Sequence, residues 1–514
     1  MMIDAIKEVT IVGGGTAGWL TAAVIAAEHH SHLADTINVT LIESPEVSSI
    51  GVGEGTWPSM RSTLEKIGIS EVEFITCCDA SFKQGSQFIG WKNGQQDDRY
   101  YHPFMTPQGY AQANLYRAWQ EFSPEQSFAE TTSIQAAVCD AGRAPKQAGT
   151  PDYAAVTNYG YHLDATKFAK LLMQHCTTKL GVKHVLDHMI DIISDGNGDI
   201  AEICTKRSGN ISGDLFIDCT GMSSLLLGKH FNIPFIEKRH ILFNDSAMAL
   251  QVPYYEDDTQ IASTTKSTAQ SNGWIWDIGL PSRQGVGYTY SSSHTSDQQI
   301  QDDLITYVAK SIGQVRAEQL SPRKISFTPG HRDKFWHKNC VAVGMASGFI
   351  EPLEASALAL IELSASMISE ELPVHRAQMD ITAKRYNQRF TYRWSRVIDF
   401  LKLHYVLSER QDSDYWLDNR HNNTLPDSLQ EQLELWKYKV PNRHDLMQNE
   451  EVFPSASYQY VLYGMGFQTL LPKIAKQSDN LNVAKTSFDD IQQNKRKYIT
   501  GLPTNRELLK LLTQ

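Results

Sequence analysis

The sequence predicts an α/β fold that combines a parallel sheet of the nucleotide-binding type with an antiparallel sheet and a helical C-terminal part. Three observations predict this fold. A glycine-rich turn separates a short apolar strand from an alanine-rich helix near the N-terminus. Strand-like alternation occupies much of residues 243–293, and a helical, aromatic-rich pattern begins near Asp380. The period of two in one region and the helical period in the other distinguish the two kinds of element.

The first predicted element is the strand Glu8–Val12 with the turn that follows it. The turn Gly13–Gly18 matches G-x-G-x-x-G, and the helix after it runs to about Glu28. In such a turn the first glycine permits the tight bend, the second lets the backbone approach a pyrophosphate, and the third lets the helix pack on the strand. The residues of the predicted cofactor turn are Gly13, Gly15, Thr16, Ala17 and Gly18.

An acidic residue follows the second predicted strand. Asn38–Ile42 is apolar, and Glu43 comes after it at about the spacing at which a carboxylate binds adenosine ribose hydroxyls. The glycine motif is weak evidence by itself, but strand, turn, helix and acidic residue together predict a dinucleotide site. NAD and FAD both remain compatible with this pattern.

Two later segments are predicted to return to the same sheet. Residues 214–221 form an apolar strand that ends in a glycine turn, which resembles the late strand of FAD-dependent monooxygenases. Cys340–Gly344 is the other buried strand. We therefore expect a Rossmann-type sheet assembled from distant parts of the chain.

The antiparallel sheet is predicted from alternating segments around Phe243–Pro253 and Trp274–Ser293. The second segment reads as a hairpin with its turn near Ser282–Gly285. Ser296 and Gln299 then form a capping-box pattern for a helix toward Ser311. The polar stretches 123–152 and 412–426 are expected to be loops.

Composition limits the class of protein. The chain has 514 residues, 41% of them hydrophobic and 20% charged, which suffices for one large core or two domains. A net charge of −11 argues against a general nucleic-acid or anionic-membrane surface. The first strand begins within about eight residues and no apolar run reaches the ~18 residues of a membrane span. Seven scattered cysteines without C-x-x-C spacing indicate free thiols, so we expect a cytoplasmic protein.

Trp274 and Trp276 are the most conspicuous pair in the predicted hairpin. Side chains at i and i+2 of a strand project on the same face, so the two indoles form one apolar wall. Beside a reactive flavin, such a wall could keep a bound substrate away from the isoalloxazine. The alternative is that both are core tryptophans that stabilise the sheet.

Five motifs occur in the order in which one family carries them, and on these motifs the chain resembles the flavin-dependent tryptophan halogenases. The family signature is G-W-x-W-x-I-P, in which Gly279 here replaces the proline and Pro281 follows two places on. The resemblance covers essentially the first 400 residues, and it implies an FAD-dependent monooxygenase-like fold. The motifs are Gly13–Trp19, Gly51–Pro58, Phe82–Lys83, Gly273–Ile278 and Gly348–Glu354.

The resemblance implies a chemistry and a domain organisation. Reduced FAD, supplied by a separate NAD(P)H-dependent flavin reductase, would react with oxygen and with chloride or bromide to give hypohalous acid, which travels to the substrate chamber. Residues 1–400 would form the FAD-binding halogenase core with the interleaved substrate-side sheet. Residues 401–514 would form a mainly helical region that completes the chamber.

Two further cofactor contacts are implied by motif position. Gly51–Thr56 resembles the family's flavin strap, which covers FAD, and Gly53 is its central glycine. A flexible surface loop is the alternative. Gly344 falls where hydroxylase-type flavoproteins carry Gly-Asp for ribityl contact, and Met345 here replaces the acidic residue.

Lys83 and Glu354 are the implied catalytic residues. Lys83 corresponds to the family lysine that hydrogen-bonds hypohalous acid or forms a haloamine, and a neutral amine is required for the second role. For an arbitrary lysine, a solvated strand position would be expected instead. Glu354, the second Glu of Glu-Pro-Leu-Glu, would polarise the hypohalous acid and accept the proton lost on rearomatisation. Ser356 and Ala357 match the positions whose backbone N–H groups bind halide.

The acceptor is expected to be an electron-rich aromatic molecule, either tryptophan, indole or a related compound, free or attached to a carrier. We expect no metal site, and a homodimer is one candidate oligomeric state. Two other functions remain open from the residues. An aromatic hydroxylase would use the same FAD fold, and a noncatalytic flavin-binding redox protein would bind FAD without oxidising halide.

Overall fold

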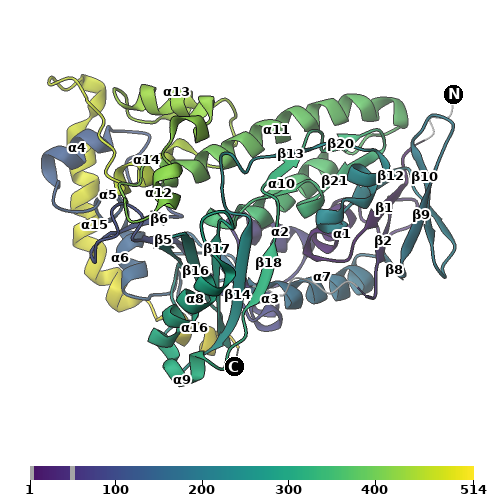
Figure 1. Cartoon of the computed structure of the whole chain (residues 1–514), viewed down its shortest axis with the longest axis horizontal. Helices are drawn as coiled ribbons and strands as arrows, with labels where there is room; N and C mark the ends of the chain where they lie inside the picture. Colours follow the sequence, from purple (N-terminus) through teal and green to yellow (C-terminus); the bar gives the residue numbers. More distant parts are fainter. Residues whose placement is uncertain (1–4, 47–52, 514) are drawn as a thin grey trace. The chain divides into compact units, whose positions relative to one another are not determined.

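The computed structural model describes residues 5–46 and 53–513 (Figure 1). The chain forms two compact units, each built from three segments. Unit 1 comprises Met1–Ala80, Leu163–Lys238 and Thr328–Trp394, and unit 2 comprises Ser81–His162, Arg239–Phe327 and Ser395–Gln514. The predicted division into an FAD-binding core (residues 1–400) and a C-terminal region that completes the chamber (residues 401–514) is a division by function, and it stays a prediction.

Unit 1 contains the predicted Rossmann-type sheet. All neighbouring strands in it are parallel except β20 and β21, which are antiparallel. The central strand β1 pairs through Val9 with Val39 on one side and with Leu215 on the other. The predicted N-terminal strands and both returning strands are therefore confirmed. In order across the sheet the strands are β20 (Trp336–His337), β21 (Cys340–Ala342), β12 (Leu215–Asp218), β1 (Glu8–Val12), β2 (Asn38–Glu43) and β8 (Lys183–Leu186).

Both faces of this sheet are covered, which explains why its strands are nearly continuous apolar runs. Helix α1 (Thr16–Glu28) is buried from Gly18 to Ala26 and packs against α7 (Ala165–Lys179) and α10 (Ser356–Glu370). An apolar cluster that includes Val12, Ile42, Ile203 and Phe216 fills the opposite side. That cluster joins the sheet to β9 (Met189–Ser194), β10 (Ile200–Thr205) and β11 (Asn210–Ser212).

Unit 2 contains the predicted antiparallel sheet. Its pairs are antiparallel except β15 with β5, which are parallel. The hairpin turn lies at 280–282, slightly earlier than predicted, because Leu280 N–H donates to Arg283 O at 2.9 Å and closes the loop there. The strand order is β18 (Arg323–Ser326), β14 (Ser246–Pro253), β17 (Arg283–Tyr290), β16 (Gly273–Gly279), β15 (Thr265–Gln270), β5 (Gly85–Ile89) and β6 (Arg99–Pro103).

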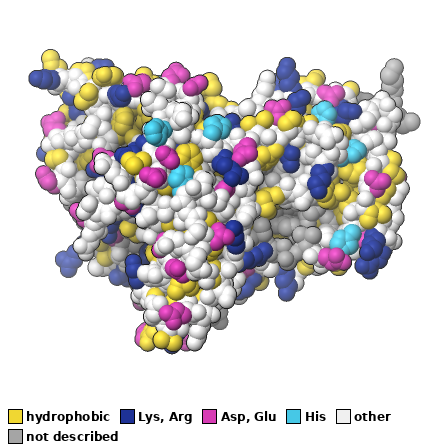
Figure 2. Space-filling view, in the orientation of Figure 1, with side chains coloured by type: hydrophobic (Ala, Val, Ile, Leu, Met, Phe, Trp, Pro, Cys, Tyr) yellow, Lys and Arg dark blue, Asp and Glu magenta, His cyan; other side chains and the backbone are white. Residues whose placement is uncertain are grey.

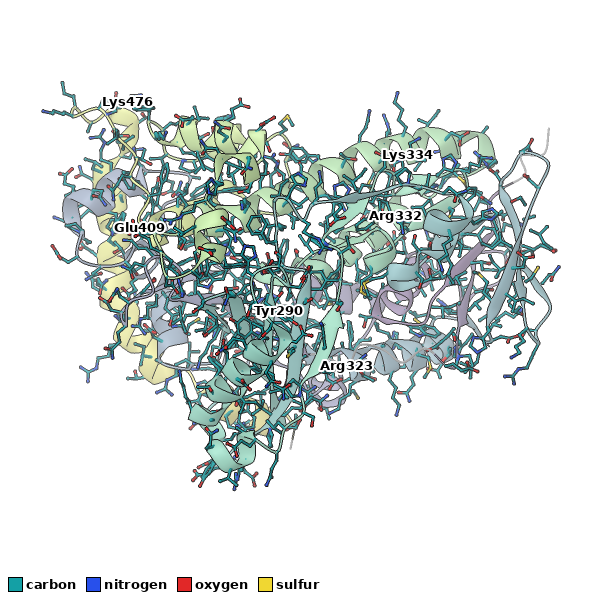
Figure 3. All side chains as sticks on the ribbon, in the orientation of Figure 1. Tyr290, Arg323, Arg332, Lys334, Glu409 and Lys476 are labelled. Carbon is teal, nitrogen blue, oxygen red and sulfur yellow. The ribbon has the colours of Figure 1, made fainter. Side chains whose placement is uncertain are left out.

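Helix α8 (Asp297–Ile312) covers one face of this sheet through Ile300, Leu304 and Val308. Ser296 caps the helix by accepting the Gln299 N–H at 3.3 Å, but the Gln299 side chain donates to Asp303 instead of returning to Ser296. The predicted capping box is therefore only half formed. Tyr290, labelled in Figure 3, donates to Asp297 at 2.6 Å and fixes the start of the helix to the end of β17.

The loop prediction is wrong in two places. Residues 123–152 contain α5 (Phe128–Thr132) and α6 (Ile134–Asp140), and residues 412–426 contain α12 (Asp414–Asp418). A complete capping box between Ser127 and Glu130 stabilises the start of α5. Short helices of this kind are stabilised by such caps and by tertiary packing, and a polar composition hides them.

The predicted helical C-terminal part is confirmed. In the described part of the chain, no helix combines the length with the apolar character needed to cross a bilayer. On the face drawn in Figure 2, basic and acidic side chains are interspersed. The helices are α11 (Arg376–Val406), which begins in unit 1 and ends in unit 2, and α13 (Asp427–Trp436), α14 (Ser455–Gly464), α15 (Leu481–Gly501) and α16 (Asn505–Leu512) in unit 2.

Candidate active site

The three motif glycines of the N-terminal turn face different surroundings. Gly13 has φ of +119°, and a Cβ atom there would lie 2.1 Å from the carbonyl oxygen of Cys219. A Cβ at Gly18 would lie 1.9 Å from the oxygen of Gly13. At Gly15, by contrast, an added Cβ would meet no described atom within 4 Å. Two of these glycines therefore make room for the chain's own backbone, and the third faces open space.

This open space lies at the N-terminus of α1. Gly15 is the N-cap residue, and within the described residues no side chain caps the helix. The first-turn N–H groups and the helix dipole are thus directed at a cradle that suits a pyrophosphate. The residues present fit a dinucleotide, while the cofactor roles of Gly13, Gly15, Thr16, Ala17 and Gly18 stay predictions.

Glu43 and Gly344 both lie against this turn. The Glu43 carboxyl carbon would be 2.2 Å from a Cβ added at Gly14, so the side chain lies directly over that glycine. Gly344 has φ of +67°, and a Cβ there would lie 2.7 Å from the Cβ of Ala17. Both residues are near the predicted cofactor cradle, as their predicted roles require.

The predicted flavin strap is only partly visible. Gly51 and Val52 lie outside the described residues, while Gly53–Gly55 forms the short strand β3. Removal of the Glu54 carboxyl from water raises its pKa to about 7. Just after the strap, the Trp57 indole donates to the backbone oxygen of Glu354 at 2.8 Å. The segment that follows the strap therefore contacts the segment that carries the predicted proton acceptor.

The backbone at Glu354 and Ala355 is strained. Both residues are left-handed, with φ of 63° at Glu354 and 54° at Ala355. Non-glycine residues in this region cost roughly 1–2 kcal/mol each and persist where the surroundings impose them, often at functional sites. The Glu354 side chain is buried, and so is that of Glu351. The strain supports a functional role for the segment, and the catalytic role of Glu354 stays a prediction.

Ser356 and Ala357 are the first two residues of α10. The N-cap, Ala355, has no side chain that could cap the helix, so the N–H groups of this first turn have no partner within the helix. Such a turn favours a small anion. The geometry suits halide, whose binding here stays a prediction.

Lys83 is buried in unit 2. It ends β4 (Ser81–Lys83), which pairs antiparallel with β7 (Gly160–Asp164), and only 1% of the residue is exposed. Its Nζ lies 5.3 Å from the centre of the Phe104 ring. An arbitrary lysine on a strand would be expected on a solvated face, and Lys83 is instead buried. Its role in halogen transfer stays a prediction.

A buried histidine accompanies Lys83. His162 lies opposite Ser81 in the β4–β7 pair, so it shares a face with Lys83 in the diagonal position. Burial and then the charge of Lys83 lower the pKa of His162 well below its ordinary value. Its Nε2 contacts the Thr265 hydroxyl at 2.8 Å. The Lys83 environment thus contains a buried imidazole that sequence reasoning did not single out.

Trp274 and Trp276 lie on one face of β16, as predicted. Their ring centres are 6.2 Å apart, and both side chains are buried. Space for Trp276 comes from Gly287 on β17, where a Cβ would lie 2.0 Å from the indole. Trp274 also contacts Trp91 at 6.2 Å. The pair therefore packs with a third indole, and its role as a chamber wall stays a prediction.

Phe104, the aromatic residue beside Lys83, was missed in the sequence, and so was the contact of the next residue, Met105, with Tyr460. Phe104 follows β6, and its N–H donates to the oxygen of Gln84 at 3.1 Å. The Tyr460 hydroxyl on α14 donates to the oxygen of Met105 at 3.0 Å. The only signal in the sequence was the aromatic stretch Tyr100-Tyr101-His102-Pro103-Phe104, and nothing in it indicates contact with Lys83.

The structure distributes the predicted residues over both units. Unit 1 holds the glycine turn, Glu43, Gly53, Gly344, Glu354 and the start of α10, and unit 2 holds Lys83 and the two tryptophans. Of the predicted cofactor residues, the glycine turn, Glu43 and Gly344 lie together around the start of α1.

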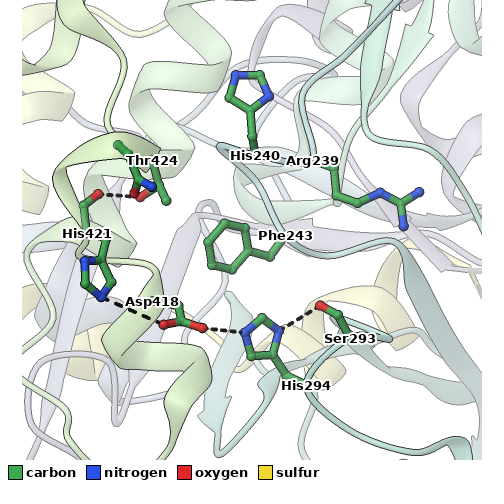
Figure 4. A pocket seen from close by; sticks show the side chains of 9 residues that line it. Arg239, His240, Phe243, Ser293, His294, Asp418, His421 and Thr424 are labelled. Carbon is green, nitrogen blue, oxygen red and sulfur yellow. Dashed lines mark hydrogen bonds and ion pairs between the residues drawn. The ribbon is translucent and has the colours of Figure 1, made fainter.

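A pocket of about 490 Å³ in unit 2 is separate from all predicted residues (Figure 4). In it, Asp418 contacts Nε2 of His294 at 3.1 Å and Nε2 of His421 at 4.0 Å. Among the residues described, no three His, Cys, Asp or Glu side chains are grouped so that they could hold a metal ion. The pocket is lined by Arg239, His240, Phe243, Ser293, His294, Asp418, His421, Asn423 and Thr424.

Comparison with known proteins identifies the family of the chain. The tryptophan halogenase family model matches residues 8–481. The chain is similar to a crystal structure of a tryptophan halogenase from Shewanella frigidimarina, with 53% identity, a TM-score of 0.96 and coverage of 100% of this chain and 99% of that one. The tryptophan C-6 flavin-dependent halogenase Tar14 has 33% identity and a TM-score of 0.91, with coverage of 99% and 100%. Tryptophan 6-halogenase SttH of Streptomyces toxytricini is 31% identical, with coverage of 99% and 98%. The chain therefore belongs to the tryptophan halogenase family.

Proposed function

We propose that this chain is a flavin-dependent halogenase that uses reduced FAD, oxygen and chloride or bromide to halogenate an electron-rich aromatic molecule. The observation that supports the proposal is the burial of Lys83, which the motif resemblance assigns to the family's lysine. Lysine is almost never fully buried without a specific partner or task. A hydroxylase would need no such lysine.

The cofactor cradle would hold FAD through the backbone of the glycine turn and the first turn of α1. Glu43 would bind the adenosine ribose, and Gly344 and the strap glycine Gly53 would approach the rest of the cofactor. When bound in reduced form, FAD supplies the oxidation of halide by oxygen. The first turn of α10, at Ser356 and Ala357, would hold the halide.

Lys83 would deliver the halogen. As an ammonium it can hydrogen-bond hypohalous acid, and as a neutral amine it can take the halogen with release of one water molecule. His162, Phe104 and the rest of the buried surroundings keep bulk water away from the amine. Water exclusion limits the loss of oxidant to side reactions.

Glu354 would accept the proton that the halogenated ring loses. A buried carboxylate on a strained backbone is held in one orientation, which suits a general base. Trp274 and Trp276 would keep the acceptor away from the flavin. This separation would make hypohalous acid, rather than the cofactor itself, the reagent that meets the ring.

The acceptor would lie among aromatic side chains near Lys83. His102 and Tyr460 have ring centres 6.1 Å apart, and they flank the segment that brings Phe104 to the lysine. Several relatives are named as tryptophan 6- or 7-halogenases, so tryptophan and indole are the first acceptors to test. A separate flavin reductase that uses NAD(P)H would supply reduced FAD.

The test is product analysis by mass spectrometry with reductase, FAD, NADH, bromide and each acceptor. We expect a brominated product that requires bromide. Lys83→Met should reduce its yield by at least about 100-fold, the lower end for a lost catalytic proton donor or acceptor, while oxidation of reduced FAD continues. Lys266→Met, on β15 of the same unit, is the control and should retain near wild-type yield.

Three results would contradict the proposal. A hydroxylated product without halide would make the protein a hydroxylase. FAD binding without halide-dependent oxidation of any acceptor would favour a noncatalytic redox protein. Wild-type bromination by Lys83→Met would remove the lysine from the mechanism.

A further inference from the structure

A histidine on the neighbouring strand contacts the predicted ribose-binding carboxylate. β8 runs parallel to β2 with Leu41 opposite His184, so the side chains of His184 and Glu43 project on the same face of the sheet. His184 Nε2 lies 2.9 Å from Glu43 Oε2. This is an ion-pair distance between two side chains that are each about a quarter exposed.

The other carboxylate oxygen faces the glycine turn. A Cβ added at Gly14 would lie 2.6 Å from Glu43 Oε1. The carboxylate is therefore located between His184 on one side and the predicted cofactor turn on the other. Only one of its two oxygens is engaged by the histidine.

The imidazole is itself held in place. The ring of Trp19 on α1 contacts the ring of His184 edge-on, with centres 5.0 Å apart and an interplanar angle of 78°. The Nε2 atom is buried from solvent, and within the described residues it makes no hydrogen bond of good alignment. The contact with Glu43 therefore rests on the 2.9 Å distance between His184 Nε2 and Glu43 Oε2 and on the fixed position of the imidazole ring.

We propose that His184 is a positioning residue for the adenosine ribose of the cofactor: it holds Glu43 Oε2 so that Oε1 stays directed at the ribose hydroxyls. The inference rests on the proposed function in so far as the cofactor is FAD. A glutamate side chain loses rotamer freedom when it binds a ligand. By restricting Glu43 beforehand, His184 reduces that loss.

The effect should be modest because the pair is partly exposed. Partly exposed polar pairs of this kind change an equilibrium by about two- to fivefold. His184→Phe keeps a ring against Trp19 but removes the nitrogen, and it should weaken FAD binding by that factor. His184→Asn is the second variant in case the larger ring disturbs packing.

The measurement is a titration of apoprotein with FAD, followed by flavin fluorescence, with competition by ADP. ADP carries the adenosine ribose and FMN does not. His184→Phe should therefore weaken the binding of ADP by the same factor as the binding of FAD and leave the affinity for FMN unchanged. His188→Phe is the matched control. It removes a similar imidazole contact, Nε2 to Glu46 at 3.2 Å, without touching Glu43, and should bind FAD as wild type does.

A double-mutant cycle with Glu43→Gln separates positioning from general damage. In the Glu43→Gln background, His184→Phe should have no further effect on FAD affinity. Equal losses in both backgrounds, an equal loss in His188→Phe, or wild-type ADP binding by both His184 variants would overturn the inference. These are binding measurements, so a failure of halogenation with intact FAD binding would count against the proposed function and not against His184.

Discussion

Gly15→Val tests the cofactor cradle, because the structure predicts opposite effects on folding and on binding. The backbone at Gly15 is extended, with φ of −77° and ψ of −177°, which valine adopts without strain. No described atom lies within 4 Å of the added Cβ. The folding cost is then limited to a poorer N-cap, about 1 kcal/mol, partly offset by the lower entropy of the unfolded chain. We expect the melting temperature to fall by only a few degrees.

The loss of FAD affinity should be much larger. The branched side chain would occupy the space through which a pyrophosphate reaches the first-turn N–H groups of α1. A hydrogen bond to a charged group contributes about 1.5–3 kcal/mol, so losing one weakens binding by at least about tenfold. The assay is a fluorescence titration with FAD alongside thermal unfolding followed by circular dichroism.

Two other glycines provide controls. Gly196, in the turn between β9 and β10, also faces no described atom within 4 Å, so Gly196→Val should leave both FAD affinity and stability close to wild type. Gly18→Ala should lower stability sharply, because its Cβ would lie 1.9 Å from the Gly13 oxygen. Wild-type FAD affinity in Gly15→Val would refute the fingerprint assignment. Unfolding of that variant would refute the conclusion that its side chain enters open space.

Three further predictions concern α10 and the segment before it. Glu354→Gln should reduce halogenation by about 100-fold while FAD affinity stays within about twofold of wild type, since only a proton acceptor is lost. Wild-type turnover by this variant would show that Glu354 is not the proton acceptor. Ala355→Gly should stabilise the protein by about 0.5–1 kcal/mol in urea unfolding, because glycine adopts φ of 54° without the steric cost that alanine has there. A loss of stability would contradict the conclusion that the backbone at Ala355 is strained. Burial raises the pKa of Glu362 from its ordinary 4.5 to about 7, although Ser59 and Thr63 donate to it. The native state therefore keeps a proton that the unfolded chain has lost, and Glu362 should by itself lower the free energy of unfolding by about 3 kcal/mol as pH rises from 4.5 to 7, in addition to the contribution of Glu54. The stability of Glu362→Gln should decline less than that of wild type by this amount, and parallel pH profiles for the two proteins would show that Glu362 does not titrate there.

The parts of the fold that sequence predicted well depend on local signals. The strand Glu8–Val12, the glycine turn and the hairpin strands β16 and β17 each have a pattern that fits within a dozen residues. The short helix α5 was missed because its capping residues, Ser127 and Glu130, lie in a polar stretch that resembles a loop.

The surroundings of the predicted site residues could not be predicted from local patterns. Lys83 contacts Phe104 and shares a face with His162, and these residues come from separate segments that only the folded chain brings together. The left-handed backbone at Glu354 and Ala355 was also unpredictable, since neither residue type favours it. Such conflicts between local preference and fold are expected at functional sites.

The position of β1 in its sheet has a consequence for biosynthesis. The strand is synthesised before the other strands of its sheet, yet it is central: one neighbour, β2, follows soon, whereas β12 is synthesised some two hundred residues later and β21 more than a hundred after that. At translation rates of about 5–20 residues per second, the nascent sheet keeps an unpaired apolar edge for on the order of ten seconds or more. An unpaired edge of this kind is where chains associate wrongly, so the nascent protein is expected to need protection by chaperones during that interval. Slower translation between β2 and β12 should therefore increase aggregation of newly made chains without changing the stability of those that have already folded.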